Sequence, residues 1–197
     1  MGLKTGHFDS DQHASFLDKI VLNTQRATQI IERIRGFIRP SASRREPVDL
    51  MRIAREVADL VADEARSHKV TFLFPEHAAS VMVTGDQVQL SQIILNVFRN
   101  AIEALSQVER REIQVTCNTK EGRAILRIRD TGPGLSPEML SMIGKPFFTT
   151  KSNGLGMGIT ISSNIAAQHG GKLSVTNANG GGAVIELNLP ALQEARL

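Results

Sequence analysis

The sequence predicts an α/β sandwich in which helices cover one face of a mixed β-sheet, preceded by a long coiled-coil-like helix. Residues 124–129 alternate between apolar and polar side chains, which is typical of a strand with one buried face. Residues 86–105 place apolar side chains at three- and four-residue steps, which predicts a helix with one buried face. Residues 16–38 repeat apolar residues at alternating four- and three-residue steps, as coiled coils do.

The first element in chain order is the helix over residues 16–38. Its seam contains one polar residue, Asn23, and Pro40 ends the helix at or before Arg39. The seam consists of Phe16, Ile20, Asn23, Ala27, Ile30, Ile34 and Phe37. Because a narrow apolar seam needs partner helices, we expect residues 1–45 to form a separate helical part and residues 46–197 to form the main domain.

The main domain shows both kinds of periodicity. It predicts strands over 48–50, 70–74, 81–84, 112–119, 124–129, 172–177 and 183–189, and helices over 51–67, 86–105, 137–143 and 156–169. The glycines at 180–182 predict a hairpin turn between the last two strands. His169, followed by two glycines, is expected to cap the last helix rather than to act in catalysis.

Composition narrows the function classes. The chain has 197 residues, is 41% hydrophobic and has a net charge of +3, which fits a globular domain and gives no support to nucleic-acid binding. Cys117 is the single cysteine, so no internal disulfide can form, and its apolar phase predicts a core position. No apolar stretch reaches membrane-spanning length. We expect a cytoplasmic chain, although a longer parent protein can still be membrane-anchored.

Polar side chains form a stripe on the helix expected over residues 86–105. Gln92, Asn96, Asn100 and Glu103 recur at helical steps on a face other than the apolar one. Asn96 and Asn100 could present two amide oxygens to one Mg²⁺, a cation that prefers oxygen ligands and bridges phosphates. Taken alone, an Asn pair is better explained by an ordinary solvated helix face.

A carboxylate follows the alternating strand. Asp130 is in phase with the buried residues of that strand, and a buried carboxylate needs hydrogen-bond donors such as the exocyclic amine of a nucleotide base. Gly132 and Gly134 let the following backbone turn tightly and approach a ligand. A plain Asp-capped turn is the alternative.

A glycine-rich segment opens the last helix. Gly154, Gly156 and Gly158 would expose backbone N–H groups and the positive end of the helix dipole to phosphate. Thr149, Thr150 and Lys151 precede them and could add hydroxyls and a positive charge, whereas a simple glycine hinge would bind nothing. Together, the elements predict a Mg·ATP pocket formed by Asn96, Asn100, Glu103, Asp130, Gly132, Gly134, Thr149, Thr150, Lys151, Gly154, Gly156, Met157 and Gly158.

Over residues 47–190 these motifs resemble the ATP-binding domain of sensor histidine kinases, which has the Bergerat-type fold. The segment 96–101 is similar to the N box, 130–134 to the first glycine box, 146–151 to the F box and lid, and 154–158 to the second glycine box. The resemblance implies that Asp130 holds the adenine amine, that Asn100 with Asn96 holds Mg²⁺, and that Lys151 with nearby amides holds phosphates. One departure is Gly144, at a position where the family often has an aromatic residue.

The resemblance also implies partners. Residues 1–45 would correspond to the second helix of the dimerisation and histidine-phosphotransfer domain, so we expect a homodimer through this helix and a response regulator receiver domain as partner. None of His7, His13, His68 and His77 has the surroundings of a phosphoacceptor. No catalytic residue is identified, and we expect that this chain does not phosphorylate itself.

Other functions exist on the same fold. ATPases such as gyrase and heat-shock chaperones, and related serine kinases, typically have Glu where this chain has Asn96, and Asn cannot act as a general base. This favours phosphoryl transfer to a histidine, whose imidazole is already nucleophilic. The other alternative is a nucleotide-binding regulatory or scaffold module without kinase activity.

Overall fold

The computed structural model describes residues 44–77, 79–145, 148 and 156–192. The chain divides between Ser41 and Ala42 into two units, and the described residues belong to the second. The expected helix over residues 16–38 lies outside the described residues. The domain boundary expected after residue 45 stays a prediction.

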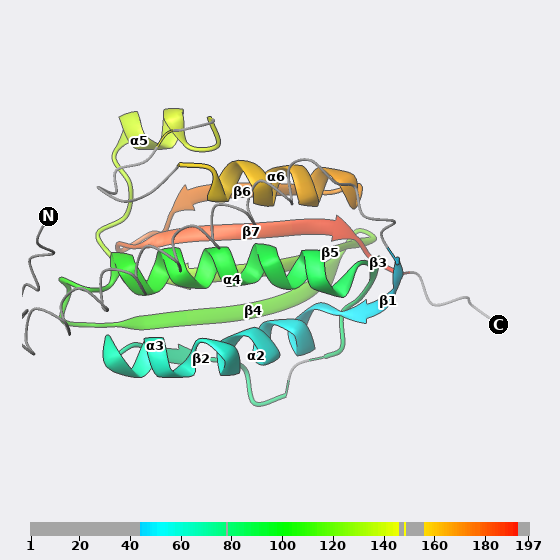
Figure 1. The fold of residues 1–197 in the computed structure, drawn as a ribbon, viewed down its shortest axis with the longest axis horizontal. Helices are drawn as coiled ribbons and strands as arrows, with labels where there is room; N and C mark the ends of the chain where they lie inside the picture. Colours follow the sequence, from blue (N-terminus) through cyan, green and yellow to red (C-terminus); the bar gives the residue numbers. More distant parts are fainter. Residues whose placement is uncertain (1–43, 78, 146–147, 149–155, 193–197) are drawn as a thin grey trace, which may run out of the picture. The chain divides into compact units, whose positions relative to one another are not determined.

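A mixed five-stranded sheet is the centre of the fold, as the sequence predicted (Figure 1). The strand order is β2-β4-β5-β7-β6, with β2 parallel to β4 and every other neighbouring pair antiparallel. The strands are β2 (Thr71–Leu73), β4 (Glu112–Lys120), β5 (Arg123–Asp130), β6 (Lys172–Asn177) and β7 (Ala183–Pro190).

Two expected strands form a small sheet of their own instead of joining the main one. β1 (Glu46–Asp49) pairs antiparallel with β3 (Met82–Gly85), and a single bridge between Val83 and Ala191 links this pair to the end of β7. Pro47 has no N–H to donate, which suits β1 to a short edge pairing rather than to a long central ladder.

The helices are α2 (Leu50–Leu60), α3 (Ala62–Ser67), α4 (Gln87–Ala104), α5 (Pro137–Met142) and α6 (Gly158–Gln168). The helix expected over residues 51–67 is interrupted at Val61, whose φ of −102° and ψ of 12° depart from α-helical geometry. Val61 and Ala65 are both buried, so the tight turn keeps the apolar side of α3 directed into the core. Elsewhere the element bounds agree with the predicted ones to within one or two residues.

Helices α2, α4 and α6 lie side by side over one face of the main sheet (Figure 1). The apolar stripe predicted on α4 is confirmed, since its members are at most 2% exposed: Leu90, Ile94, Val97, Ala101 and Leu105. Burial of each large side chain contributes about 1.5–3 kcal/mol to folding. No helix in the described part of the chain combines the length and apolarity that crossing a bilayer requires.

The alternation predicted in β5 is also confirmed. Ala124, Leu126 and Ile128 are buried beneath the helices, whereas Arg127 is exposed on the opposite face. Asp130, the last residue of β5, is in phase with the buried set and is only 4% exposed. The strand therefore delivers a carboxylate to the helix-covered side of the sheet.

Candidate nucleotide site

Asp130 is held by backbone amides from two separate segments. Its Oδ1 accepts hydrogen bonds from Gly132 N at 2.9 Å and from Ala183 N at 3.1 Å. Among the described residues no donor meets Oδ2. These two bonds lower the cost of burying the carboxylate and fix its orientation. Oδ2 is left as an acceptor that can receive an amine.

Glycines allow the backbone to close around this carboxylate. A Cβ on Gly182 would stand 1.9 Å from the carbonyl oxygen of Asp130, and the φ of Gly182 is +88°. A Cβ on Gly132 would stand 2.9 Å from Asp130 Oδ1 and 3.5 Å from Ala104 O, at the end of α4. Side chains at either position would displace the Asp130 carboxylate or its strand.

Asn177, at the end of β6, fixes the loop that follows Asp130. Its Oδ1 accepts from Leu135 N at 2.8 Å, and its Nδ2 donates to Leu135 O at 2.7 Å. The same oxygen would be 3.0 Å from a Cβ on Gly134, whose φ is +74°. The second glycine of the Asp130 motif therefore makes room for a paired amide clamp.

Asn96 joins α4 to the first turn of α6. Its Nδ2 donates to Ser162 Oγ at 3.1 Å, and its Oδ1 would lie 2.4 Å from a Cβ on Gly158. The hydroxyl of Ser162 is buried with its residue, which is 1% exposed. The Asn96 oxygen is therefore positioned at the start of α6, where backbone N–H groups favour an anion.

No side chain of the described residues caps the first turn of α6. Met157 precedes the helix as its N-cap residue without a capping hydrogen bond, and Gly156 before it has a φ of +64°. Because the first N–H groups of a helix have no partner within the helix, they remain available to phosphate oxygens.

The other predicted residues of α4 follow Asn96 along the helix. Asn100 lies one turn further and is half-buried, and Glu103 is exposed near the helix end. Among the described residues, no group of three His, Cys, Asp or Glu side chains is close enough to hold a metal ion. A cation at this site would thus depend on amide oxygens, phosphates and water, a set that fits Mg²⁺.

Four predicted site residues, Thr149, Thr150, Lys151 and Gly154, lie outside the described residues. The structure brings Asn96 together with Gly158, and Asp130 together with Gly132. Reasoning from sequence missed several supporting residues: Ser162, Asn177, Gly182 and Ala183. Of these, only the Gly180–Gly182 run carries a signal in the sequence. It predicts a hairpin turn, which the positive φ angles at all three positions support.

His169 is the C-cap of α6, as predicted, and it also connects two helices. Its Nδ1–H donates to Ile165 O at 2.8 Å, and its Nε2 accepts from Asp86 N at 3.0 Å, which defines the neutral tautomer. Asp86 is the N-cap residue of α4. The imidazole thereby ties the end of α6 to the start of α4, the two helices that flank the site.

Cys117 and Glu112 are two of the groups whose pKa is shifted, and neither belongs to the predicted nucleotide pocket. Burial, with a smaller contribution from Asp49, raises the pKa of the Cys117 thiol to about 12. Cys117 is half-buried against the core rather than fully buried, and its thiol is unsuited to act as a nucleophile. Near Asp130, the hydrogen bond from Arg110 lowers the pKa of Glu112, whose backbone N–H donates to Thr131 Oγ1.

Comparisons with known proteins agree with this geometry. The family model of histidine kinase-, DNA gyrase B- and HSP90-like ATPases matches residues 85–193, more than half of the chain. The sensor protein FixL of Bradyrhizobium diazoefficiens is 35% identical over 91% of the chain, and the sensor histidine kinase ZraS of Salmonella typhi is 31% identical over 85%. The chain spans 36% of the length of each of these two relatives.

Solved structures show the same fold. The catalytic domain of the histidine kinase ThkA aligns with 74% of the chain and 95% of its own length, at 29% identity and a TM-score of 0.66. ThkA in complex with the response regulator protein TrrA aligns with 98% of the chain and 55% of its own, at 25% identity and a TM-score of 0.77. The chain therefore belongs to the histidine kinase-, DNA gyrase B- and HSP90-like ATPase family, and it carries the ATPase-type domain of a sensor histidine kinase.

Proposed function

We propose that this chain binds Mg·ATP and transfers the γ-phosphoryl group to a histidine outside this sequence. The observation that supports this most directly is the Asp130 carboxylate, buried and held at Oδ1 by two amides, while no donor among the described residues occupies Oδ2, which could accept from an adenine amine. A base with a carbonyl oxygen in place of that amine would bring an acceptor against Oδ2 of Asp130, which is also an acceptor. Two acceptors facing each other in a buried site are unfavourable.

The phosphates would lie at the start of α6. There no side chain of the described residues caps the first N–H groups of the helix that begins at Gly158, and Asn96 presents its oxygen to the same turn. Thr149, Thr150, Lys151 and Gly154 would complete the phosphate contacts from the preceding segment. Gly132 and Gly134 would let the backbone approach the nucleotide.

Asn100 and Asn96 would hold Mg²⁺. Amide oxygens one helical turn apart, beside an uncapped helix start, form a donor set that suits this ion together with phosphate oxygens and water. The ion would neutralise negative charge that develops on the phosphates. Glu103 would contribute at the rim of the pocket.

Asn96 also supports histidine as the acceptor of the phosphoryl group. Its amide donates to Ser162, so at this position the chain offers a fixed hydrogen-bonding group and no proton acceptor that could activate water or a hydroxyl. Transfer to an imidazole requires no such base. A histidine phosphotransfer helix, a response regulator receiver domain and a second copy of this chain are the proposed partners, and the cytoplasm is the proposed location.

Phosphotransfer in trans tests this function. The chain would be mixed with γ-labelled ATP, Mg²⁺ and a separately produced histidine phosphotransfer hairpin from a sensor histidine kinase. We expect acid-labile, alkali-stable label on the hairpin, and none when its histidine is replaced by glutamine. Release of inorganic phosphate at the same rate with and without the hairpin would indicate an ATPase instead. Tight ATP binding without either product would favour the regulatory or scaffold function.

A further inference from the structure

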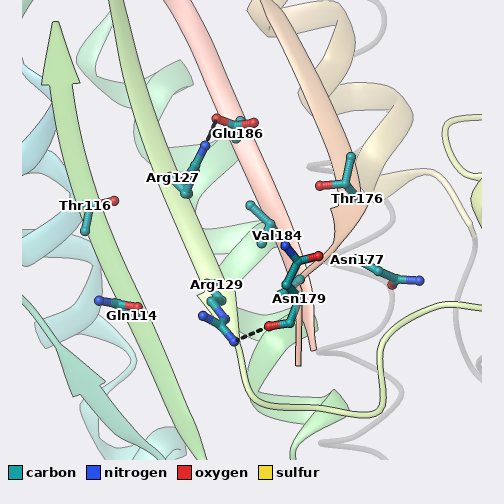
Figure 2. Close-up of a pocket in the computed structure, with 10 residues that line it drawn as sticks. Gln114, Thr116, Arg127, Arg129, Thr176, Asn177, Asn179, Val184 and Glu186 are labelled. Atoms are coloured by element: carbon teal, nitrogen blue, oxygen red, sulfur yellow. Dashed lines mark hydrogen bonds and ion pairs between the residues drawn. The ribbon is translucent and has the colours of Figure 1, made fainter. Parts of the chain in front are cut away.

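A polar pocket lies on the face of the main sheet opposite the helices (Figure 2). Its volume is about 440 Å³. The lining side chains of β4, β5 and β7 alternate along the strands with buried residues such as Val115, Ile128 and Ile185, so they face away from the core and from the proposed nucleotide site. The strands contribute Gln114 and Thr116 from β4, Arg127 and Arg129 from β5, and Val184 and Glu186 from β7.

The two arginines have different neighbours. Arg127 stands directly opposite Glu186 in the β5–β7 register and forms an ion pair with it at 2.9 Å (Figure 2). Arg129 stands opposite Val184 on one side and Gln114 on the other, and neither residue carries a charge. The register therefore neutralises one arginine and leaves the other without a carboxylate.

The guanidinium of Arg129 is only partly satisfied. Its Nη2 donates to Asn179 O at 3.2 Å, which fixes the side chain over the pocket (Figure 2). Its Nε is buried and has no hydrogen-bond partner among the described residues. A buried donor without an acceptor is uncommon and costly, so the Arg129 guanidinium stands to gain from an added acceptor.

We propose that this pocket receives a carboxylate side chain of an acidic peptide segment from a partner protein, with Arg129 as its anchor. Two arginines and one glutamate give the lining a net charge of +1. A singly charged carboxylate balances that excess, whereas a doubly charged phosphate would exceed it. The planar fork of Arg129 is suited to carboxylate oxygens.

The rest of the lining favours a peptide over a small molecule. Pockets for small ligands are lined mainly by apolar and aromatic groups, whereas the apolar members here are Val184 and Ala178. The side chains of Gln114, Thr176 and Asn179 offer amides and hydroxyls that can pair with peptide N–H and C=O groups. The pocket extends across β4, β5, β7 and the end of β6, which suits an extended segment (Figure 2).

Nuclear magnetic resonance titration of the full chain tests the proposal with two capped peptides. One is Ser-Thr-Ser-Glu-Ser-Thr-Ser, and the other has Gln in place of Glu. We expect saturable shifts of the Gln114, Thr116 and Asn179 amides with the Glu peptide and affinity lower by about tenfold or more with the Gln peptide. If the native chain binds the two peptides with equal affinity, the proposal is overturned by this titration alone.

Variants locate the effect on Arg129. Arg129→Gln should weaken binding of the Glu peptide by about tenfold or more, and Arg129→Lys should restore part of the loss by keeping the charge. Lys172→Gln is the matched control, since Lys172 is exposed on the same face of β6 but lies outside the pocket. An equal loss in Arg129→Gln and Lys172→Gln would mean general electrostatic attraction and would contradict a specific site.

Small anions identify the source of the carboxylate. Acetate alone and inorganic phosphate alone should shift the same amides much more weakly than the Glu peptide at equal concentration. If acetate binds as well as the peptide, the ligand is a free carboxylate and a partner segment is excluded. If phosphate binds better than both, the charge argument fails.

Discussion

Asn100 lies one turn beyond Asn96 on α4, so the two amides are spaced to act on one cation. We predict that Asn100→Ala weakens Mg·ATP binding by about tenfold or more while metal-free ADP binding changes much less, because the amide contributes through the metal. Calorimetric titrations of both ligands measure the difference. Gln92→Ala, at a half-buried position one turn before Asn96, should leave both unchanged. Equal losses for the two nucleotides in Asn100→Ala would remove the ligand role.

Cys117 provides a test of the packing of the sheet. Burial raises its thiol pKa from 9.0 to about 12, so thiolate is scarce in the folded chain at pH 8. We predict alkylation about 100- to 1,000-fold slower in the folded chain than in denaturant. The raised pKa gives a stabilising contribution that is complete below pH 9 and is lost as the pH rises toward 12. Similar alkylation rates in both states would show that Cys117 is accessible and not packed against the core.

His169 acts at the scale of elements, because its two nitrogens connect the end of α6 to the start of α4. His169→Ala leaves the Asp86 N–H without its acceptor, and we predict a loss of about 1–3 kcal/mol in the free energy of unfolding. Urea denaturation measures this loss. His77→Ala, in an exposed turn, should have little effect and serves as the control. A matching stability for the two variants would refute the connecting role.

A substitution at Gly158 should affect the stability of α6 and the affinity for ATP differently. Alanine favours a helix over glycine by about 1 kcal/mol, yet a Cβ here would stand 2.4 Å from Asn96 Oδ1. We therefore predict that Gly158→Ala retains the fold but weakens ATP binding by about tenfold. Asn164→Ala, at an exposed position of α6, should keep full affinity. Unchanged ATP affinity in Gly158→Ala would show that contact between Asn96 and the first turn of α6 is unimportant.

Local periodicity was enough to predict α4, β5 and the burial of Asp130, since each depends on neighbouring side chains in one element. The separate β1–β3 sheet depends on hydrogen bonds between distant segments, such as Leu50 N to Val81 O. The same is true of the supporting contacts in the site. Ser162 and Asn177 meet their partners across 66 and 42 residues, so no local pattern could reveal them.

For the whole molecule, the seam over residues 16–37 predicts association of two chains, although it lies outside the described residues. Each buried large side chain contributes about 1.5–3 kcal/mol, so a few paired layers can offset the entropy of dimerisation. Ile30→Glu with Ile34→Glu should give a monomer in sedimentation that still binds ATP. Gln25→Glu with Gln29→Glu, which adds the same charge off the seam, should stay dimeric. A native chain that is already monomeric would contradict this role of the seam.

The ATP-to-GTP affinity ratio of Asp130→Asn tests the central claim most directly. Asparagine keeps an oxygen for Gly132 N and Ala183 N, so the fold should survive, but it replaces Oδ2 with an amide donor. We predict that ATP affinity falls by about tenfold or more and that the preference for ATP over GTP disappears. Asp59→Asn, at an exposed position on α2, should retain the native preference. An unchanged ATP-to-GTP ratio in folded Asp130→Asn would contradict the assignment of Asp130 to the adenine base and with it the proposed nucleotide site.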